Sequence, residues 1–103
     1  MLPEQAGTDL GGFASELEDM VLEDVYYDLW TRSDALDPKD RSLVTLGLIM
    51  GVGNLDALGE HVPLVLHHGV TVPELEELVY HAAAYVGHLS ASSLRKTIAQ
   101  VLR

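Results

Sequence analysis

Apolar residues recur at helical spacing along most of the chain. From Phe13 onward they fall three or four positions apart with acidic residues between them, which predicts an amphipathic helix that reaches about Trp30, with or without a break. No segment alternates apolar and polar residues between turn signals, as a half-buried strand would. The pattern therefore predicts an all-α protein of five or six helices joined by short loops.

Capping residues mark the ends of the next two predicted helices. Asp37 is an N-cap acceptor followed by Pro38 at the first helical position, which predicts a helix from about residue 39 to about residue 50. The glycines of Gly51-Val52-Gly53 suit its C-cap, since glycine readily adopts the left-handed conformation. Asn54 then predicts the start of a helix that ends at His67-His68-Gly69.

The last two predicted helices follow the same signals. Thr71 and Glu74 have the spacing of a capping box, so a helix is expected to start there and to run to about Gly87. Ser90 is the predicted N-cap of a final helix that reaches Val101.

Pro63 falls inside the helix that Asn54 is predicted to cap. Proline removes a backbone hydrogen bond and crowds the carbonyl four residues earlier, here that of Gly59, so we expect a kink. Two interpretations stay open: the kink only improves packing, or it opens a small pocket beside His61.

Charge and composition narrow the possible partners. The 16 acidic and 6 basic residues give a net charge of −10, which disfavours nucleic acid and anionic membrane surfaces as partners. The chain has no cysteine, which excludes disulfides, thiolate metal sites and thiol redox chemistry. With 48% apolar residues in only 103, part of the apolar surface is expected to be buried between subunits of a homo-oligomer.

The N-terminal residues and the uncharged stretch in the middle of the chain bear on where in the cell the protein is expected. Residues 1–12 are rich in Gly, Pro and polar residues and are predicted to form a mobile N-terminal arm ahead of a single helical domain at 13–103. They carry no basic region or apolar run of a secretory signal. The uncharged stretch 42–55 is too short to span a bilayer, so a cytoplasmic protein without membrane contact is expected.

Ionisable residues gather on one face of the helix predicted after Thr71. At 100° per residue, Glu77, His81 and His88 lie within about 40° of one another if the helix persists, with Tyr85 at the margin of that face. His61 lies on the preceding helix. Two facing helices would therefore bring His61, Glu77 and His81 around one cavity.

Three interpretations of this set stay open. The histidines are half-buried structural residues at helix or subunit contacts, or they are general acid–base groups, because a histidine oriented by a carboxylate moves protons near neutral pH. The third is a metal site, for which Glu77-x-x-x-His81 supplies only two ligands and no HExxH is present. We therefore predict no metal and no cofactor.

An ordered series of short segments from Leu29 onward identifies a family resemblance. The segments are residues 30–32 and 36–45, Leu58 and His61, residues 69–71 with Glu74 and Glu77, and residues 85–87. In this series the chain resembles the carboxymuconolactone decarboxylase-like family, which shares its fold with alkylhydroperoxidase-type disulfide peroxidases. The resemblance implies an orthogonal all-α fold that assembles into dimers, trimers or hexamers, with active sites near the subunit interfaces.

Several positions depart from the family pattern. The peroxidase branch carries a Cys-x-x-Cys pair before the histidine that corresponds to His61, and this chain has Asn54 and Ala57 there. Decarboxylase members often carry an arginine and a glutamate at these two positions, and neither is present. The proline that follows the family's Tyr-x-Gly is replaced by His88. A dithiol peroxidase cycle is therefore excluded.

The resemblance and the retained histidine predict a cofactor-free lyase or decarboxylase-like enzyme that transfers protons on a small carbonyl or lactone substrate. His61 is the expected proton carrier, and Glu77 and His81 are expected to orient it or to serve as the second acid–base group. The residues expected to contact the substrate are Tyr85, His88 and Asn54. The alternative is a catalytically silent member that binds a small molecule or acts as an oligomeric assembly partner.

Overall fold

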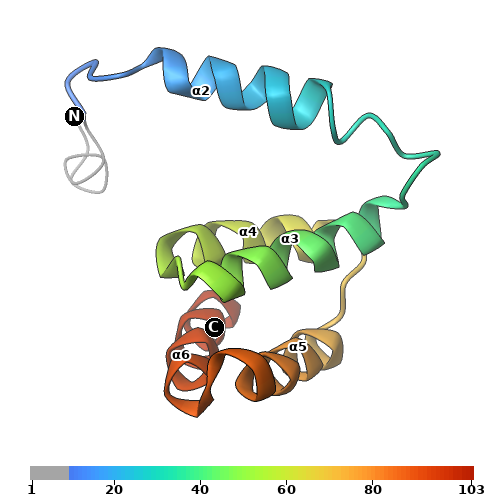
Figure 1. Cartoon of the computed structure of the whole chain (residues 1–103), viewed down its shortest axis with the longest axis vertical. Helices are drawn as coiled ribbons and strands as arrows, with labels where there is room; N and C mark the ends of the chain where they lie inside the picture. Colours follow the sequence, from blue (N-terminus) through green and yellow to red (C-terminus); the bar gives the residue numbers. More distant parts are fainter. Residues whose placement is uncertain (1–9) are drawn as a thin grey trace. The chain divides into compact units, whose positions relative to one another are not determined.

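The computed structural model describes residues 10–103, and within them the chain divides into two compact units with a boundary between Ser33 and Asp34 (Figure 1). Of the arm predicted at residues 1–12, positions 1–9 lie outside the described residues. The single helical domain at 13–103 stays a prediction.

Between residues 10 and 33 the first unit contains one short helix, and its winding changes along its length. After turns at residues 11–15, α2 (Glu16–Val21) continues directly into the π-helical segment η1 (Leu22–Tyr27). The backbone N–H of Asp28 donates to the carbonyl of Glu23, five residues earlier, at 3.1 Å. Turns at both ends make this helix shorter than the one predicted from Phe13 to Trp30. Neither segment buries a residue.

The helix α3 (Pro38–Val52) has the predicted N-cap and runs two residues beyond the predicted end at about residue 50. The Asp37 side chain accepts a hydrogen bond from the backbone N–H of Lys39 at 3.0 Å, and Pro38 occupies the first helical position. Gly53 ends the helix in the left-handed conformation at φ 73°. The helix buries Arg41, Ser42, Leu46 and Met50.

The helix α4 (Leu55–His67) also has its predicted cap. The Asn54 side chain accepts from the backbone N–H of Ala57 at 3.0 Å. Pro63 lies inside the helix with its side chain exposed, and α4 continues past it to His67. Gly59 faces α6, where a Cβ would lie 3.6 Å from Cγ2 of Thr97.

The predicted capping box is present at the start of α5 (Val72–Val86). Thr71 and Glu74 bind each other's backbone N–H groups, at 3.2 Å and 2.8 Å. The last helix, α6 (His88–Leu102), starts two residues before the predicted cap at Ser90, so that prediction was wrong. Gly87, at φ 100°, turns the chain at once, and its carbonyl accepts from the N–H of Ala91 at 3.0 Å.

The four helices of the second unit pack in a closed ring. The packed pairs are α3 with α4, α4 with α6, α6 with α5, and α5 with α3. Figure 1 shows α3 and α4 side by side and α6 running from the end of α5 toward α4. All four helices contribute to the core, whose members are Leu46, Met50, Leu58, Val62, Val65, Val70, Leu75, Val79, Ala82, Ala91, Leu94 and Ile98. In this ring α4 and α5 lie on opposite sides of the core.

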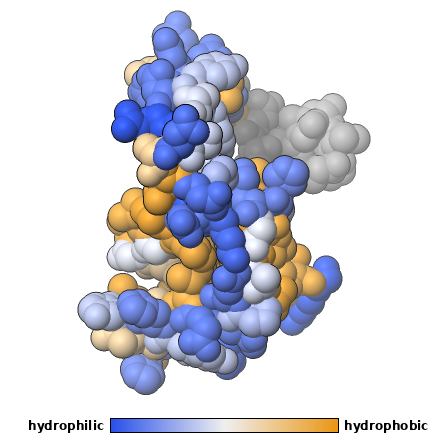
Figure 2. Space-filling view, turned by 90° about the vertical axis from the view of Figure 1, so that its right-hand side faces the viewer, coloured by the Kyte–Doolittle hydropathy of each residue, from blue (hydrophilic) through white to orange (hydrophobic). Residues whose placement is uncertain are grey.

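The described residues form an all-α fold, as predicted: helices account for all the regular structure in residues 10–103. Within that range no helix is long and apolar enough to cross a membrane. Apolar residues nonetheless reach the surface in broad patches (Figure 2). On α3 they form an outer row of Val44, Leu48 and Val52, of which Leu48 is 68% exposed and Val52 78%.

Candidate functional site

Two adjoining hollows follow the contact between α3 and α5, and we call them together the α3/α5 groove. Their volumes are about 250 Å³ and about 560 Å³, and both are lined by Leu78 and His81. The remaining lining residues of the first are Gly47, Met50, Gly51, Ala82, Tyr85 and Val86; those of the second are Leu43, Glu74, Glu77 and Tyr80. The groove therefore gathers three of the predicted site residues, Glu77, His81 and Tyr85.

Glycines form the α3 wall of the groove. Gly47 and Gly51 lie one helical turn apart, and a Cβ built at either position meets no atom within 4 Å. The opposite wall carries His81 and Tyr85, whose rings are stacked with centroids 5.0 Å apart and an interplanar angle of 17°. Stacking on Tyr85 holds the His81 imidazole on the α5 side of the groove. Because Gly47 and Gly51 have no side chains, the α3 side leaves room for a ligand.

Glu77 precedes His81 by one turn of α5 and lines the same groove. Its carboxylate makes no hydrogen bond or ion pair within residues 10–103 and is exposed to solvent. It is therefore free to accept a proton or to bind a polar group of a ligand.

Glu74, at the end of the groove, has a structural role instead. Its carboxylate accepts from the backbone N–H of Thr71 at 2.8 Å and pairs with Nζ of Lys39 at 3.0 Å. The hydrogen bond from Thr71, followed by the interaction with Lys39, lowers the pKa of Glu74 below its ordinary value. Glu74 thus stays ionised near neutral pH and links the start of α3 to the start of α5.

His61 lies elsewhere in the ring. Its Nδ1 atom is 2.8 Å from the carbonyl oxygen of Ala57 on its own helix α4. A carbonyl only accepts, so Nδ1 carries the hydrogen and the neutral ring presents Nε2 as an acceptor. Neither His61 nor Pro63 lines either hollow of the α3/α5 groove. Since α4 and α5 are opposite each other, one chain does not bring His61 to Glu77 and His81.

The other two predicted substrate contacts lie outside the groove. Asn54 is exposed, and its side-chain oxygen caps α4. His88 is the first residue of α6 and is exposed.

Sequence reasoning missed two features. The fully buried Ser42 on α3 has its Oγ 3.2 Å from Nδ1 of His68, at the end of α4, a link that no spacing along the chain reveals. The glycine wall was missed as well, although the i, i+4 spacing of Gly47 and Gly51 was a readable signal for an open stripe on a helix.

Metal ligands do not cluster in the described part of the chain. Among residues 10–103 there is no group of three or more His, Asp or Glu side chains that could hold a metal ion. In the groove Glu74 is engaged by Thr71 and Lys39, which leaves Glu77 and His81, fewer ligands than a protein zinc site uses. Its chemistry is that of a carboxylate and an imidazole beside an apolar floor.

Comparisons with known proteins agree on one family. The model of the carboxymuconolactone decarboxylase family matches residues 16–97. A nitrosuccinic acid decarboxylase from Metarhizium robertsii is 41% identical over 70 residues, which are 68% of this chain and 48% of that protein. A 4-carboxymuconolactone decarboxylase from Acinetobacter baylyi is 30% identical over 92 residues, 89% of this chain and 67% of that protein. The chain thus spans about half the length of the fungal relative. No solved structure matches it significantly.

Proposed function

The chain belongs to the carboxymuconolactone decarboxylase family, and from this we propose that it is a cofactor-free decarboxylase-type lyase acting on a small activated carboxylic acid. Two relatives are named as decarboxylases of nitrosuccinic acid and of 4-carboxymuconolactone. Each of these acids carries a nitro group or a lactone carbonyl that can take up negative charge. We expect the substrate of this chain to combine a carboxylate with such a group.

The observation that carries the proposal is the convergence of Glu77, His81 and Tyr85 on one groove. In the proposed reaction the bond between the carboxylate carbon and its neighbour breaks and CO₂ departs. The electron pair left behind moves into the nitro or carbonyl group, and the carbon then takes a proton from the imidazolium of His81. Glu77 or water returns a proton to His81, so one carboxylate and one proton yield CO₂ and a new C–H bond.

The predicted role of His61 as a proton carrier requires a second subunit. Its Nε2 atom is available as an acceptor, but α4 lies across the core from the groove of the same chain. We therefore propose that an assembly of several copies brings α4 of one copy to the α3/α5 groove of another. The test is to mix His61→Ala and His81→Ala proteins before assembly. If each active site takes His61 from one copy and His81 from another, the mixture regains turnover that neither variant has alone. If each active site lies within one chain, the mixture stays inactive.

The decarboxylation itself is tested with nitrosuccinate and a panel of lactone acids, by following CO₂ release. Removal of a general acid or base lowers the rate by about 10²–10⁴, so His81→Gln and Glu77→Gln are expected to lose turnover at that scale. Glu60→Gln is the matched control, since Glu60 is an exposed carboxylate on α4. Turnover at the wild-type rate in a folded His81→Gln protein would refute the assignment. Saturable binding without any turnover would replace it with a binding role.

Homo-oligomer formation is the second part of the proposal. Leu17, Met20 and Tyr27 on the short helix of the first unit are apolar, and a helix of this length needs tertiary contacts to be stable in water. The outer row of α3, Val44, Leu48 and Val52, is also apolar. Light scattering of Leu48→Glu is expected to give a smaller species than the wild type, and Ser92→Glu, at an exposed position of α6, is expected to leave the size unchanged. An unchanged size in both would overturn this interface.

A further inference from the structure

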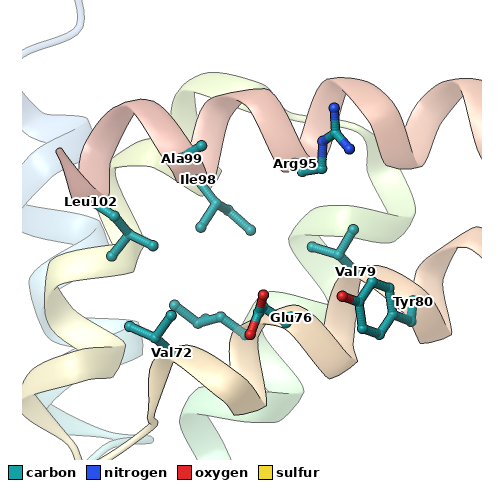
Figure 3. A pocket seen from close by; sticks show the side chains of 9 residues that line it. Val72, Glu76, Val79, Tyr80, Arg95, Ile98, Ala99 and Leu102 are labelled. Atoms are coloured by element: carbon teal, nitrogen blue, oxygen red, sulfur yellow. The ribbon is translucent and has the colours of Figure 1, made fainter.

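A separate pocket lies between α5 and α6 (Figure 3), and we call it the α5/α6 pocket. Its volume is about 180 Å³. Its walls are mostly apolar, and the apolar residues that line it are Val72, Leu75, Val79, Ile98, Ala99 and Leu102. Leu75 and Ile98 are buried at its floor, with 1% and 5% exposure. The pocket is thus an apolar recess that fits a small hydrocarbon body.

Polar groups border this recess. Glu76 and Tyr80 lie one turn apart on α5, and Figure 3 shows the carboxylate and the phenol on the side of α5 that faces the gap between the helices. Arg95, on α6, has its guanidinium turned away from α5 in the same view. Neither Glu76 nor Arg95 forms an ion pair within residues 10–103. A carboxylate and an aromatic ring therefore stand beside the pocket without a cation between them.

We propose that the α5/α6 pocket binds a small amphipathic amine, with its apolar body in the recess and its protonated nitrogen at Glu76 and Tyr80. A carboxylate attracts an ammonium group, and the face of a tyrosine ring adds a cation–π contribution. The chain's net charge of −10 favours the approach of cations. This ligand class is opposite in charge to the acids proposed for the α3/α5 groove, so the two sites take different molecules.

Tyr80 connects the two sites, because it lines both the α5/α6 pocket and the larger hollow of the α3/α5 groove. It follows Glu76 by one turn and directly precedes His81. A ligand held in the α5/α6 pocket at Tyr80 therefore lies next to the groove.

The test uses three probes of one shape: benzylamine, benzyl alcohol and benzoate, titrated into the full chain at pH 7 while methyl and amide NMR signals are followed. Benzylamine is expected to shift signals of Val79, Ile98 and Leu102 with saturation. Because an exposed charge contact and an exposed cation–π contact each contribute at most about 1 kcal/mol, benzyl alcohol should bind about 3- to 10-fold more weakly. Benzoate should bind more weakly than the alcohol.

Three variants make the outcome decisive. Glu76→Gln should weaken benzylamine binding toward the affinity of benzyl alcohol and leave the alcohol unchanged, whereas Glu60→Gln on α4 should change neither. Ala99→Leu fills the recess and should abolish binding of both probes. Equal affinity for all three probes, an unchanged benzylamine affinity in Glu76→Gln, or shifts confined to residues outside the pocket would each overturn the proposal. None of these outcomes depends on decarboxylase activity.

Discussion

Replacing Gly47 with alanine tests the open wall of the α3/α5 groove through stability. Gly47 lies inside α3, and a Cβ there meets no atom within 4 Å, so the new methyl group causes no clash. Alanine is favoured over glycine in a helix interior by about 0.8–1.0 kcal/mol, because glycine loses more backbone freedom on folding. We therefore expect the free energy of unfolding to rise by about 0.5–1 kcal/mol. For a domain of this size each kcal/mol raises Tm by about 4–8 °C.

The measurement is urea and thermal unfolding followed by circular dichroism at one fixed protein concentration, since assembly makes Tm depend on concentration. Gly59→Ala is a matched control with ordinary contacts, 3.6 Å to Cγ2 of Thr97, and should give a similar gain. Gly53→Ala, at φ 73°, should lose about 1 kcal/mol or more because the left-handed conformation strains an alanine. A loss in Gly47→Ala as large as that in Gly53→Ala would mean that the groove wall is occupied, and the reasoning would fail. Gly47→Leu, which fills the groove, should stay folded and lose turnover.

Three further predictions concern the stability of the helices around the groove. Leu46→Ala should lower the free energy of unfolding by about 2–5 kcal/mol in urea denaturation, because Leu46 is fully buried in the core. Thr71→Ala should cost about 0.5–2 kcal/mol, since the cap of α5 is lost, and Thr71→Ser should restore most of it. The third follows from the lowered pKa of Glu74: its stabilisation is present above the pKa of the unfolded chain and is lost as pH falls through the folded-state pKa. The Tm difference between wild type and Glu74→Gln should therefore shrink from pH 7 toward pH 3, and a constant difference would contradict it.

Local signals account for the parts of the fold that were predictable from sequence. The caps at Asp37, Asn54 and Thr71 act within three residues of the chain, so their hydrogen bonds could be expected before any tertiary contact was known. The error at Ser90 has the same origin. A serine is a common N-cap, but Gly87 already turned the chain and let α6 begin at His88.

The candidate site was predictable only within one helix. Glu77, His81 and Tyr85 share a face because 3.6 residues make a turn, and the structure brings all three to the α3/α5 groove. The expected meeting of His61 with Glu77 and His81 depended on which helices are neighbours. Helical periodicity gives the face of each helix but not the order of helices around a core, so it did not exclude α4 and α5 on opposite sides of the ring.

The order of the ring also explains why α5 is the helix on which both proposed sites depend. In a closed ring each helix has two neighbours, and α5 packs against α3 on one side and α6 on the other. Its residues therefore form two rows at i, i+4 spacing, Glu76 and Tyr80 toward α6, and Glu77 and His81 toward α3. Adjacent residues on a helix differ by about 100° in direction, which places Glu76 and Glu77 at different contacts. A substitution at Glu76 and one at Glu77 should consequently affect different ligands although the two residues are neighbours in the chain.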